Sequence, residues 1–354
     1  MMAKKVVVVG GGIVGCLTAL ALNDRGCQVT LVERNVVAAQ TSGESSWAGA
    51  GILFPLLPWL YKDEVNKLAM AGAAMYPQLC ERLLTKTGID PQYITSGMQL
   101  LPPYDENLAI NWCKINAIPI QKNFTGMLLP LVAQVRPPNL LQALRQLLIQ
   151  QNVTLFENTQ LEPLKNNDYI DGWKTNTGAV LKADAYVVTS GAWSFEILKE
   201  TLLKLNIKPM RGQILLYDAT KLPAKDKPNN IIYQDGFYLV PRRDGLILAG
   251  STLEDVGFNT ETTESMRQQL QQKAEKILPS LKHTAVIKHW SGLRPGTPDN
   301  LPTIATHPTI KNLYLNTGHF RYGLTMAPAS AALVTALILG ETPQIDVMPY
   351  AQVC

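Results

Sequence analysis

Residues 5–33 read "KVVVVGGGIVGCLTALALNDRGCQVTLVE", and this stretch decides the fold. A β-branched run, Val6–Val9, has the composition of a buried strand. The pattern G-x-G-x-x-G follows at once and opens a mainly apolar segment, Ile13–Asn23, that predicts a helix. Gly26 ends this helix, and "CQVTLVE" supplies a second strand. Strand, glycine loop, helix and strand in this order are typical of a dinucleotide-binding unit.

Each glycine of the pattern has a physical purpose in such a unit. Gly10 permits the tight turn, Gly12 lets a pyrophosphate approach the backbone, and Gly15 lets helix and strand pack closely. The helix directs its free N–H groups and the positive end of its dipole at the pyrophosphate. Glu33 ends the second strand, where its carboxylate can accept hydrogen bonds from a ribose, and this favours FAD or NAD over NADP. A glycine-rich turn in an unrelated α/β fold is the alternative.

The segment after Glu33 separates FAD from NAD. An NAD-binding half would continue with another βαβ unit, but residues 34–55 read "RNVVAAQTSGESSWAGAGILFP". Small residues let the backbone lie against a large flat ligand, and the hydroxyls of Ser45 and Ser46 can bind phosphate. A plain surface loop is the alternative, although the apolar end of this segment argues against full exposure.

Composition excludes several classes of protein. The 354 residues are 46% hydrophobic and 17% charged, as in an ordinary globular protein of two or so domains. The formal net charge of +4 comes from 32 basic and 28 acidic residues, which is too small an imbalance to indicate a nucleic-acid partner. No apolar stretch of membrane-spanning length is free of charges or turn signals, and the start lacks a signal-peptide core, so we expect a cytoplasmic protein. The five cysteines and four histidines show no metal-ligand spacing, and a metal site is not expected.

Five further stretches carry a resemblance to a known family. They are "SSWAGAGIL", "ADAYVVTSGAWS", "FYLVPRRDGLILAGSTLEDVGF", "WSGLRPGTPDNLPTIA" and "YLNTGHFRYGLTMAPASAALVTALILG". Together with the N-terminal motif, they make the chain resemble the D-amino-acid oxidase-type flavoproteins, most closely the glycine oxidase branch. The match runs nearly end to end and is weak only over residues 55–135.

The resemblance implies an α/β fold with two domains. A Rossmann-like FAD-binding domain of the glutathione-reductase type would be discontinuous and would comprise residues 1–85, 135–205 and 286–354. A second α+β domain, built on a mostly antiparallel sheet, would bind the substrate and comprise residues 86–134 and 206–285. The family also implies non-covalent FAD, because no cysteine falls at a recognisable position for covalent attachment.

Local patterns support this arrangement independently. Residues 184–193 indicate a buried strand that ends at Gly191, and residues 236–252 indicate two strands joined by a turn at 243–245. Residues 263–281 form a polar helix with apolar residues at helical spacing and a stop at Pro279.

Near the C-terminus, "NLYLNTG" indicates a strand that ends at Gly318, and Ala331–Leu339 indicates the next helix. The loop between them, His319–Met326, would lie against the flavin ring, where backbone N–H groups near the helix start can stabilise negative charge. An ordinary loop that caps a helix is the alternative. The cofactor contacts implied in this way are Gly10, Gly12, Ile13, Val14, Gly15, Glu33, Arg34, Ser45, Ser46, Ala50, Gly51, Ile52, Leu161, Gly191, His319, Phe320, Arg321, Tyr322, Gly323, Leu324 and Thr325.

Three residues resemble the substrate-binding side chains of the family. Arg294, in "GLRPGTPD", matches the arginine that pairs with the substrate carboxylate, and a planar guanidinium fork suits that geometry. Tyr238 matches an active-site tyrosine, and Arg321 would add positive potential beside the flavin. The alternatives are a surface arginine, a core tyrosine and a structural salt bridge, respectively.

The implied reaction is oxidation of a C–N bond in glycine, sarcosine or a small D-amino acid. The neutral amine gives its α-hydrogen as hydride to the flavin, the resulting imine hydrolyses to a 2-oxo acid, and oxygen is reduced to hydrogen peroxide. A role in thiamine (thiazole) synthesis and association into a homo-oligomer are further implications of the family. Two alternatives remain open: a D-amino-acid dehydrogenase that passes electrons to a quinone, and an FAD-binding module without turnover.

Four positions depart from the family pattern near the expected pocket. Gly236 and Leu253 stand where glycine oxidases carry a histidine and a methionine, and Tyr322 replaces an asparagine. Trp47 lies in a stretch that is usually built of small residues. We therefore expect a small amino acid as substrate without choosing glycine alone.

Overall fold

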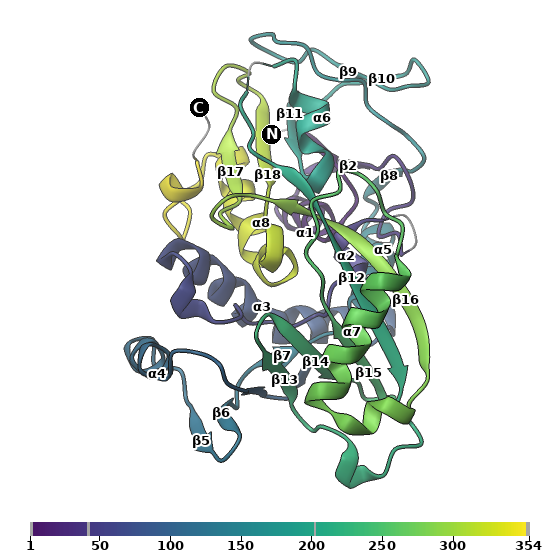
Figure 1. Ribbon diagram of the computed structural model, residues 1–354. Helices are drawn as coiled ribbons and strands as arrows, with labels where there is room; N and C mark the ends of the chain where they lie inside the picture. The colour runs from purple at the N-terminus through teal and green to yellow at the C-terminus, as the bar shows by residue number, and fades with distance from the viewer. Residues whose placement is uncertain (1–2, 41–42, 202, 352–354) are drawn as a thin grey trace.

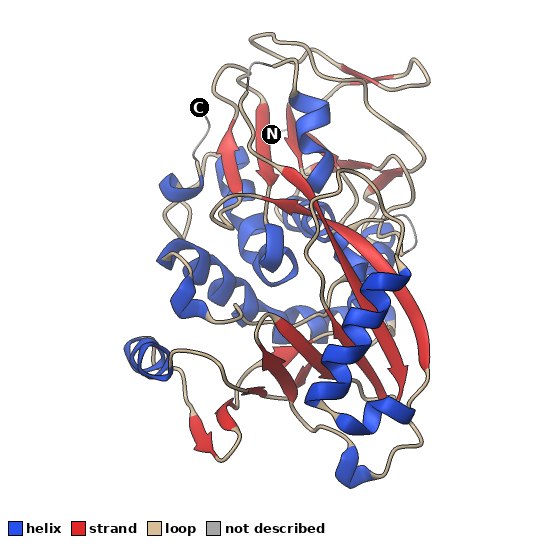
Figure 2. Cartoon of the chain, in the orientation of Figure 1, coloured by secondary structure: helices blue, strands red, loops and turns tan. Residues whose placement is uncertain are grey.

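Two large β-sheets organise the chain in the computed structural model, which describes residues 3–40, 43–201 and 203–351. A six-stranded sheet has the order β17-β18-β11-β1-β2-β8, and an eight-stranded sheet has the order β16-β12-β15-β14-β13-β4-β6-β5. Figure 1 shows the first sheet in the upper part of the molecule and the second in the lower part, and Figure 2 shows the helices around them. The fold is mixed α/β, as the sequence predicts.

The six-stranded sheet is parallel except for the pair β17·β18. Strand β1 lies inside this sheet and pairs in parallel with both of its neighbours, β2 and β11. Val8 of β1 lies opposite Leu31 of β2 on one side and Val187 of β11 on the other. All three side chains are fully buried, as β-branched and leucine runs in a doubly covered sheet should be. The strands are β1 (Lys5–Val9), β2 (Gln28–Val32), β8 (Thr154–Phe156), β11 (Ala185–Val188), β17 (Thr303–Thr306) and β18 (Leu313–Thr317).

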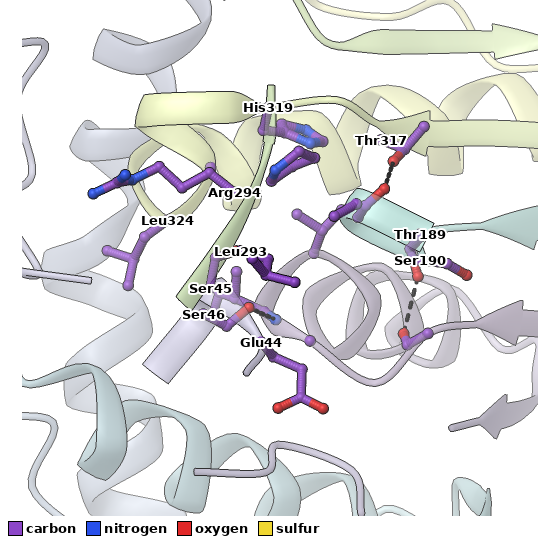
Figure 3. A pocket seen from close by; sticks show the side chains of 18 of the residues that line it. Glu44, Ser45, Ser46, Thr189, Ser190, Leu293, Arg294, Thr317, His319 and Leu324 are labelled. Atoms are coloured by element: carbon purple, nitrogen blue, oxygen red, sulfur yellow. Dashed lines mark hydrogen bonds between the residues drawn. The ribbon is translucent and has the colours of Figure 1, made fainter. Parts of the chain in front are cut away.

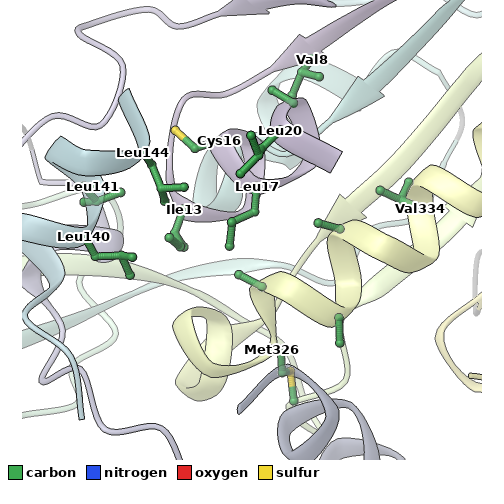
Figure 4. Close-up of a cluster of buried hydrophobic side chains, with 14 of the residues drawn as sticks. Val8, Ile13, Cys16, Leu17, Leu20, Leu140, Leu141, Leu144, Met326 and Val334 are labelled. Atoms are coloured by element: carbon green, nitrogen blue, oxygen red, sulfur yellow. The ribbon is translucent and has the colours of Figure 1, made fainter. Parts of the chain in front are cut away.

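Four helices form an apolar layer with this sheet. Helix α8 packs against both α1 and α3, and α5 packs against α1 and α3. Figure 4 shows Ile13, Leu17 and Leu20 of α1 in the cluster shared with α5 and α8. The helices are α1 (Ile13–Asp24), α3 (Asp63–Thr87), α5 (Pro137–Gln150) and α8 (Gly323–Leu339), and two shorter helices are α2 (Ser45–Ala48), which packs on α5, and α6 (Ser194–Leu198).

Absent side chains allow two of these contacts. A Cβ at Gly15 would lie 1.8 Å from the carbonyl oxygen of Gly10, so α1 meets the end of β1 backbone to backbone. A Cβ at Gly72 of α3 would lie 2.1 Å from the carbonyl oxygen of Thr325 in α8. Both distances are far below any real carbon–oxygen contact, so these helices reach their positions only where a glycine stands.

The eight-stranded sheet is antiparallel except for β13·β4. Its longest pair joins β12 and β16, eleven residues each, and α7 covers one face by packing Leu270 and Ala274 onto Leu215 and Tyr217. The strands are β4 (Met98–Leu100), β5 (Gln121–Asn123), β6 (Gly126–Leu129), β12 (Lys208–Asp218), β13 (Ile231–Gln234), β14 (Phe237–Pro241), β15 (Leu246–Gly250) and β16 (Val286–Gly296). The remaining elements are α4 (Glu106–Ile115), α7 (Glu264–Ile277) and the short strands β3 (Ile94–Thr95), β7 (Ala133–Gln134), β9 (Trp173–Lys174) and β10 (Val180–Leu181).

Most local predictions are confirmed. The predicted first strand and the helix after the glycine loop fall within β1 and α1, and the predicted second strand, residues 27–33, contains β2. The hairpin β14–β15 turns at residues 242–245, α7 ends at Ile277 before Pro279, and β18 ends at Thr317.

The predicted start of the C-terminal helix at Ala331 is wrong. A 3₁₀ turn, η5 (Phe320–Tyr322), leads directly into α8 at Gly323, and α8 continues through Pro328. A proline cannot donate to the carbonyl four residues earlier, which is that of Leu324. The hydroxyl of Tyr76 in α3 donates to that carbonyl at 2.6 Å, so the helix continues without an unsatisfied acceptor.

The predicted domain boundaries remain a prediction. The six-stranded sheet draws its strands from residues 5–32, 154–188 and 303–317, which fall within the segments assigned to FAD binding. Strand β16, however, pairs with β12 in the eight-stranded sheet, although the predicted division groups residues 286–354 with the FAD-binding part.

One helical stretch, Phe320–Leu339, is long and apolar enough to cross a membrane by length and composition. In this fold it is a core element, since 72% of its most apolar window is buried and it packs between α1 and α3.

The contact at Gly72 predicts an unusual response to a helix-favouring substitution. Gly→Ala inside a helix normally stabilises a protein by about 0.5–1 kcal/mol. For Gly72→Ala we expect destabilisation by about 1–3 kcal/mol instead, because the new methyl group must separate α3 from the α8 backbone. Urea unfolding measures the change. Ala74→Gly, at an exposed position of the same helix, is the control and should cost only the propensity difference of about 0.5–1 kcal/mol. A gain in stability for Gly72→Ala would show that the close approach is not a constraint.

Candidate functional site

One long cavity passes between the C-terminal edge of the parallel sheet and the face of the antiparallel sheet. Its walls come from the glycine loop, residues 44–56, residues 159–161, residues 189–197, strands β14 and β16, and residues 316–325. Figure 3 shows Arg294, His319 and Leu324 on one part of its wall and Glu44, Ser45, Ser46 and Thr189 on another. Segments more than 300 residues apart in the chain therefore meet around one space.

The structure brings together nearly all of the predicted site residues. Gly15 alone does not border the cavity, because it serves the helix–strand contact described above. The residues that do border it are Gly10, Gly12, Ile13, Val14, Glu33, Arg34, Ser45, Ser46, Ala50, Gly51, Ile52, Leu161, Gly191, Tyr238, Arg294, His319, Phe320, Arg321, Tyr322, Gly323, Leu324 and Thr325. Their individual roles remain predictions.

Glu33 stands at the nucleotide end with acceptor capacity to spare. Its Oε2 accepts from the N–H of Gly11 at 2.7 Å, and its Oε1 accepts from the N–H of Asn35 at 2.9 Å. Burial raises the pKa of this carboxyl group, while the two backbone hydrogen bonds oppose that shift. Each carboxylate oxygen has a further lone pair, so both can still accept a hydroxyl proton from a ribose.

The N-terminus of α1 is open to the cavity. Gly12 precedes the helix, and a Cβ there would lie 2.9 Å from the hydroxyl oxygen of Ser46. That oxygen accepts the N–H of Ile13 at 3.0 Å, which ties α2 to the start of α1. A hydroxyl group and a helix N-terminus at one point are suited to a phosphate group.

Sequence reasoning missed an aromatic contact beside the nucleotide end. The guanidinium of Arg34 lies 3.8 Å from the ring centre of Trp193, and Phe258 stacks on this tryptophan at 5.6 Å. Trp193 borders the cavity just after β11. Its position in "SGAW", at the end of a predicted strand, is the signal that could have identified it.

Sequence reasoning also missed Arg242, which supports the middle of the cavity. Its guanidinium donates to the carbonyls of Ala50 at 2.7 Å and Val135 at 3.0 Å and to Oε1 of Gln134 at 2.6 Å. Burial lowers its pKa to about 10, so it remains protonated at neutral pH. Because Ala50 borders the cavity, Arg242 holds that wall without facing the ligand space. Nothing in "PRRDG" distinguishes it from the adjacent Arg243.

The start of α8 forms the opposite wall. Gly323, Leu324 and Thr325 border the cavity, so the positive end of a seventeen-residue helix faces it. The hydroxyl of Thr325 donates to the carbonyl of Ile52 at 3.0 Å, and that of Tyr322 donates to the carbonyl of Leu56 at 3.0 Å. These bonds fix the C-terminal wall against the segment that follows the nucleotide motif.

His319 is a neutral group in this wall. Its side chain is 2% exposed, and its Nε2 has no hydrogen-bond partner among the described residues. Burial lowers its pKa to about 3, so the imidazole is uncharged at neutral pH.

Arg294 and Tyr238, the predicted substrate-binding residues, both border the cavity and lie near each other. Arg294 extends from β16, and its Nη2 donates to Oγ of Ser251 at 2.8 Å while its Nη1 donates to the carbonyl of Thr252 at 3.2 Å. Burial lowers the pKa of this guanidinium and the nearby charge of Arg321 adds to that effect, while the hydroxyl of Tyr238 opposes it. The guanidinium of Arg294 nonetheless stays protonated. No carboxylate of the described residues lies within ion-pair distance of Arg294.

Arg321 also borders the cavity, and its side chain is exposed. Its guanidinium lies 5.4 Å from the ring centre of Phe320, and it forms no ion pair within residues 3–40, 43–201 and 203–351. The structural salt bridge that competed with its predicted role is therefore not found in the described part of the chain.

The positions that depart from the family pattern fall in different places. Gly236 and Leu253 border a second hollow that shares Ser251 and Arg321 with the main cavity. Tyr322 borders the main cavity, whereas Trp47 stacks on Trp290 at 5.9 Å and lies outside the lining.

The residues present fit an FAD molecule. The cavity extends from a carboxylate that can take a ribose, past a glycine-lined helix N-terminus, to a second helix N-terminus. A Cβ at Gly10 would lie 2.9 Å from backbone atoms of Thr189 and Ser190, so the missing side chain lets the glycine loop pack directly on the residues that follow β11.

Comparison with known proteins agrees with this geometry. The family model described as FAD dependent oxidoreductase (DAO) matches residues 5–337. The chain is 39% identical over 368 residues to the glycine oxidase of Pseudomonas aeruginosa, with 99% of each chain covered. It is 30% identical over 366 residues to the bifunctional protein ThiO/ThiG of Trichormus variabilis, with 96% of this chain and 53% of that protein covered.

Solved structures show the same fold. The crystal structure of glycine oxidase from Geobacillus kaustophilus superposes with a TM-score of 0.90 at 24% identity, covering 99% of this chain and 98% of that one. Iminodiacetate oxidase from Chelativorans sp. BNC1 superposes with a TM-score of 0.86 at 23% identity, covering 98% of both chains.

The buried imidazole of His319 predicts an acid-sensitive contribution to stability. Its pKa is about 3 in the folded protein, and the unfolded chain has the ordinary value of about 6.5. As the pH falls, the unfolded state binds a proton first, so this contribution is complete above about pH 6.5 and is lost toward pH 3. Between pH 7 and pH 5 the loss is about 2 kcal/mol.

Urea unfolding of FAD-saturated wild type and His319→Gln at pH 7, 6 and 5 measures this contribution. Glutamine does not titrate, so the free energy of unfolding of the variant should fall less between pH 7 and pH 5, by about 2 kcal/mol. His283→Gln, at an exposed position, is the control and should leave the wild-type slope unchanged. A His319→Gln protein with the wild-type slope would show that this histidine titrates normally.

Proposed function

The chain belongs to the FAD dependent oxidoreductase (DAO) family, and we propose that it oxidises the C–N bond of glycine or another small amino acid such as sarcosine or a small D-amino acid. The product is an imine that hydrolyses to ammonia, or an amine, and the 2-oxo acid. The observation that carries the proposal is Arg294, whose half-buried side chain borders the FAD cavity and whose hydrogen-bond partners are neutral oxygen atoms.

A guanidinium in that position is suited to bind a carboxylate. It keeps its charge, its N–H groups can form two parallel hydrogen bonds, and the surrounding protein strengthens the attraction because the site is partly desolvated. Ser251 and Thr252 supply hydroxyl and carbonyl oxygens but no negative charge. The positive charge of Arg294 is therefore left for a ligand.

The chain's own residues bind and orient the substrate in this proposal. Arg294 takes the carboxylate, the hydroxyl of Tyr238 beside it adds a hydrogen bond, and Arg321 contributes positive potential near the mouth. Bound FAD supplies the hydride acceptor for the α-hydrogen. Glu33 and the N-terminus of α1 would hold the nucleotide part, and the N-terminus of α8 would face the ring.

The acceptor of the electrons is a separate part of the proposal. We propose oxygen, with hydrogen peroxide as the product, because glycine oxidases are among the relatives over the full chain. The names of the ThiO/ThiG relatives support a role in thiamine biosynthesis, and a cytoplasmic setting fits that role. Comparing oxygen consumption with quinone reduction tests the acceptor: fast quinone reduction with negligible oxygen use would mean a dehydrogenase.

An anaerobic titration tests the substrate class. Glycine, sarcosine, D-alanine, D-proline and a larger D-amino acid are added separately to the yellow protein, and flavin absorbance is followed. Bleaching by glycine or sarcosine supports the proposal. Bleaching by bulkier D-amino acids alone would mean that Gly236, Leu253 and Tyr322 enlarge the pocket, and no bleaching by any of them would contradict the proposed reaction.

The proposed pairing of Arg294 with the substrate carboxylate, called the clamp below, predicts a large effect of Arg294→Ala. Loss of a bidentate, charge-assisted contact should cost about 2–4 kcal/mol of transition-state binding, measured as a fall in kcat/KM per bound flavin. Lys282→Ala, at an exposed position outside the cavity lining, is the control and should keep wild-type kinetics. Near-normal kcat/KM in Arg294→Ala would show that another group binds the carboxylate.

A further inference from the structure

The guanidinium of Arg294 is held by neighbours that none of the sequence arguments identified. Its Nη2 donates to Oγ of Ser251 at 2.8 Å, just beyond the end of β15. Its Nη1 donates to the backbone carbonyl of Thr252 at 3.2 Å. Two adjacent residues therefore hold the two terminal nitrogens, and the remaining N–H groups of the five stay available for a ligand.

Gly212 provides the space for that guanidinium. In the β12·β16 pair Gly212 lies opposite Gly292, two residues before Arg294, so position 294 is its diagonal neighbour on the same face. A Cβ at Gly212 would lie 2.2 Å from Nη1, 2.3 Å from Nη2 and 2.4 Å from Cζ of Arg294. The end of the arginine side chain thus occupies the volume that any other residue at 212 would need.

The segment that carries the acceptors is itself fixed to β12. The N–H of Gln213 donates to Oγ1 of Thr252 at 2.8 Å, and that hydroxyl donates to Oε1 of Glu254 at 2.6 Å. Glu254 also forms an ion pair with Arg211, which is 4% exposed, at 2.7 Å. The oxygen atoms that face Arg294 therefore have little freedom to move.

We propose that Ser251 and Gly212 are positioning residues that set the orientation in which Arg294 binds the carboxylate of the substrate. The inference rests on the proposed function of Arg294. Ser251 holds one terminal nitrogen with a neutral acceptor, which orients the guanidinium without neutralising it. Because Gly212 has no side chain, the guanidinium of Arg294 can occupy the space beside it.

Acetate is a direct probe, because it carries only the carboxylate and its binding can be followed in the flavin spectrum of the FAD-loaded protein without turnover. Ser251→Ala removes the acceptor, so we expect the Kd for acetate and the KM for the best amino-acid substrate to rise about tenfold. The kcat per bound flavin should change less than about threefold, because the reacting centre is untouched. Ser251→Thr restores a hydroxyl group and should recover most of the affinity.

Gly212→Ala tests the second half of the proposal. The atoms that a new Cβ would meet belong to the mobile end of a long side chain, so we expect the protein to fold with a thermal midpoint close to that of wild type. The displaced guanidinium should bind acetate at least about tenfold more weakly. A thermal midpoint near wild type together with wild-type acetate affinity would overturn the role of Gly212.

Two further variants separate failure of this inference from failure of the proposed function. Ser291 lies three residues before Arg294 on the same strand, and its hydroxyl donates to the carbonyl of Thr260. Ser291→Ala removes that hydroxyl and should leave the acetate Kd unchanged. If Arg294→Ala loses acetate binding while Ser251→Ala keeps it, the positioning role is wrong and the clamp stands. If Arg294→Ala binds acetate like wild type, the clamp is wrong and the inference falls with it. An equal loss in Ser291→Ala and Ser251→Ala would also overturn the positioning role, because both would then reflect a general disturbance of the sheet.

Discussion

The backbone contact between α1 and β1 at Gly15 is the constraint on which the rest of the site depends. With the Gly15 Cα so near the carbonyl of Gly10, the helix starts directly above the strand end. That placement points the first N–H groups of α1 at the carboxyl edge of the parallel sheet, where Glu33 and Thr189 directly follow β2 and β11. The hydroxyl of Thr189 donates to the carbonyls of Val9 and Gly10, at 2.9 Å each, and closes the same turn from the other side. The nucleotide end of the cavity is therefore a consequence of one missing side chain.

A second glycine contact, between Gly72 of α3 and Thr325 of α8, helps to build the C-terminal wall of the cavity. Gly72 lets α3 touch the carbonyl of Thr325, and one turn further along α3 the hydroxyl of Tyr76 takes the carbonyl of Leu324 that Pro328 leaves free. Helix α8 can therefore begin at the cavity and still contain a proline. Since α8 also packs on α1, the two helix N-termini that border the cavity are held by one apolar layer.

The sequence predicted the elements whose signal is local and missed those that depend on distant partners. The N-terminal unit β1-α1-β2, the β14–β15 hairpin and α7 have their apolar periodicity, turn residues and stop signals within a few positions of the sequence. Their positions agree with the prediction. The start of α8 was misplaced because its proline is tolerated only through Tyr76, 252 residues earlier. Arg242, Ser251 and Gly212 were missed for the same reason: each acts across a strand pairing or a loop contact, and no local pattern marks them. The predicted contact residues other than Gly15 border one cavity, and their individual roles remain predictions.

The charges around the cavity divide into two kinds, and this division argues for the position of an anionic ligand. Arg242 makes three hydrogen bonds to carbonyl and amide oxygens, and Arg211 pairs with the carboxylate of Glu254 and donates to the carbonyl of Glu261. Arg294 donates to a hydroxyl and one carbonyl oxygen and has no carboxylate within ion-pair distance among the described residues, and the neighbouring charge of Arg321 disfavours its protonated form further. Leaving a guanidinium in this state costs free energy that a bound carboxylate would recover, since an ion pair in a partly desolvated site is stronger than in water. The positive charge of Arg294 and the carboxylate of Glu33 give the cavity a direction: a small substrate would place its anionic group at Arg294, and a nucleotide ribose would lie at Glu33.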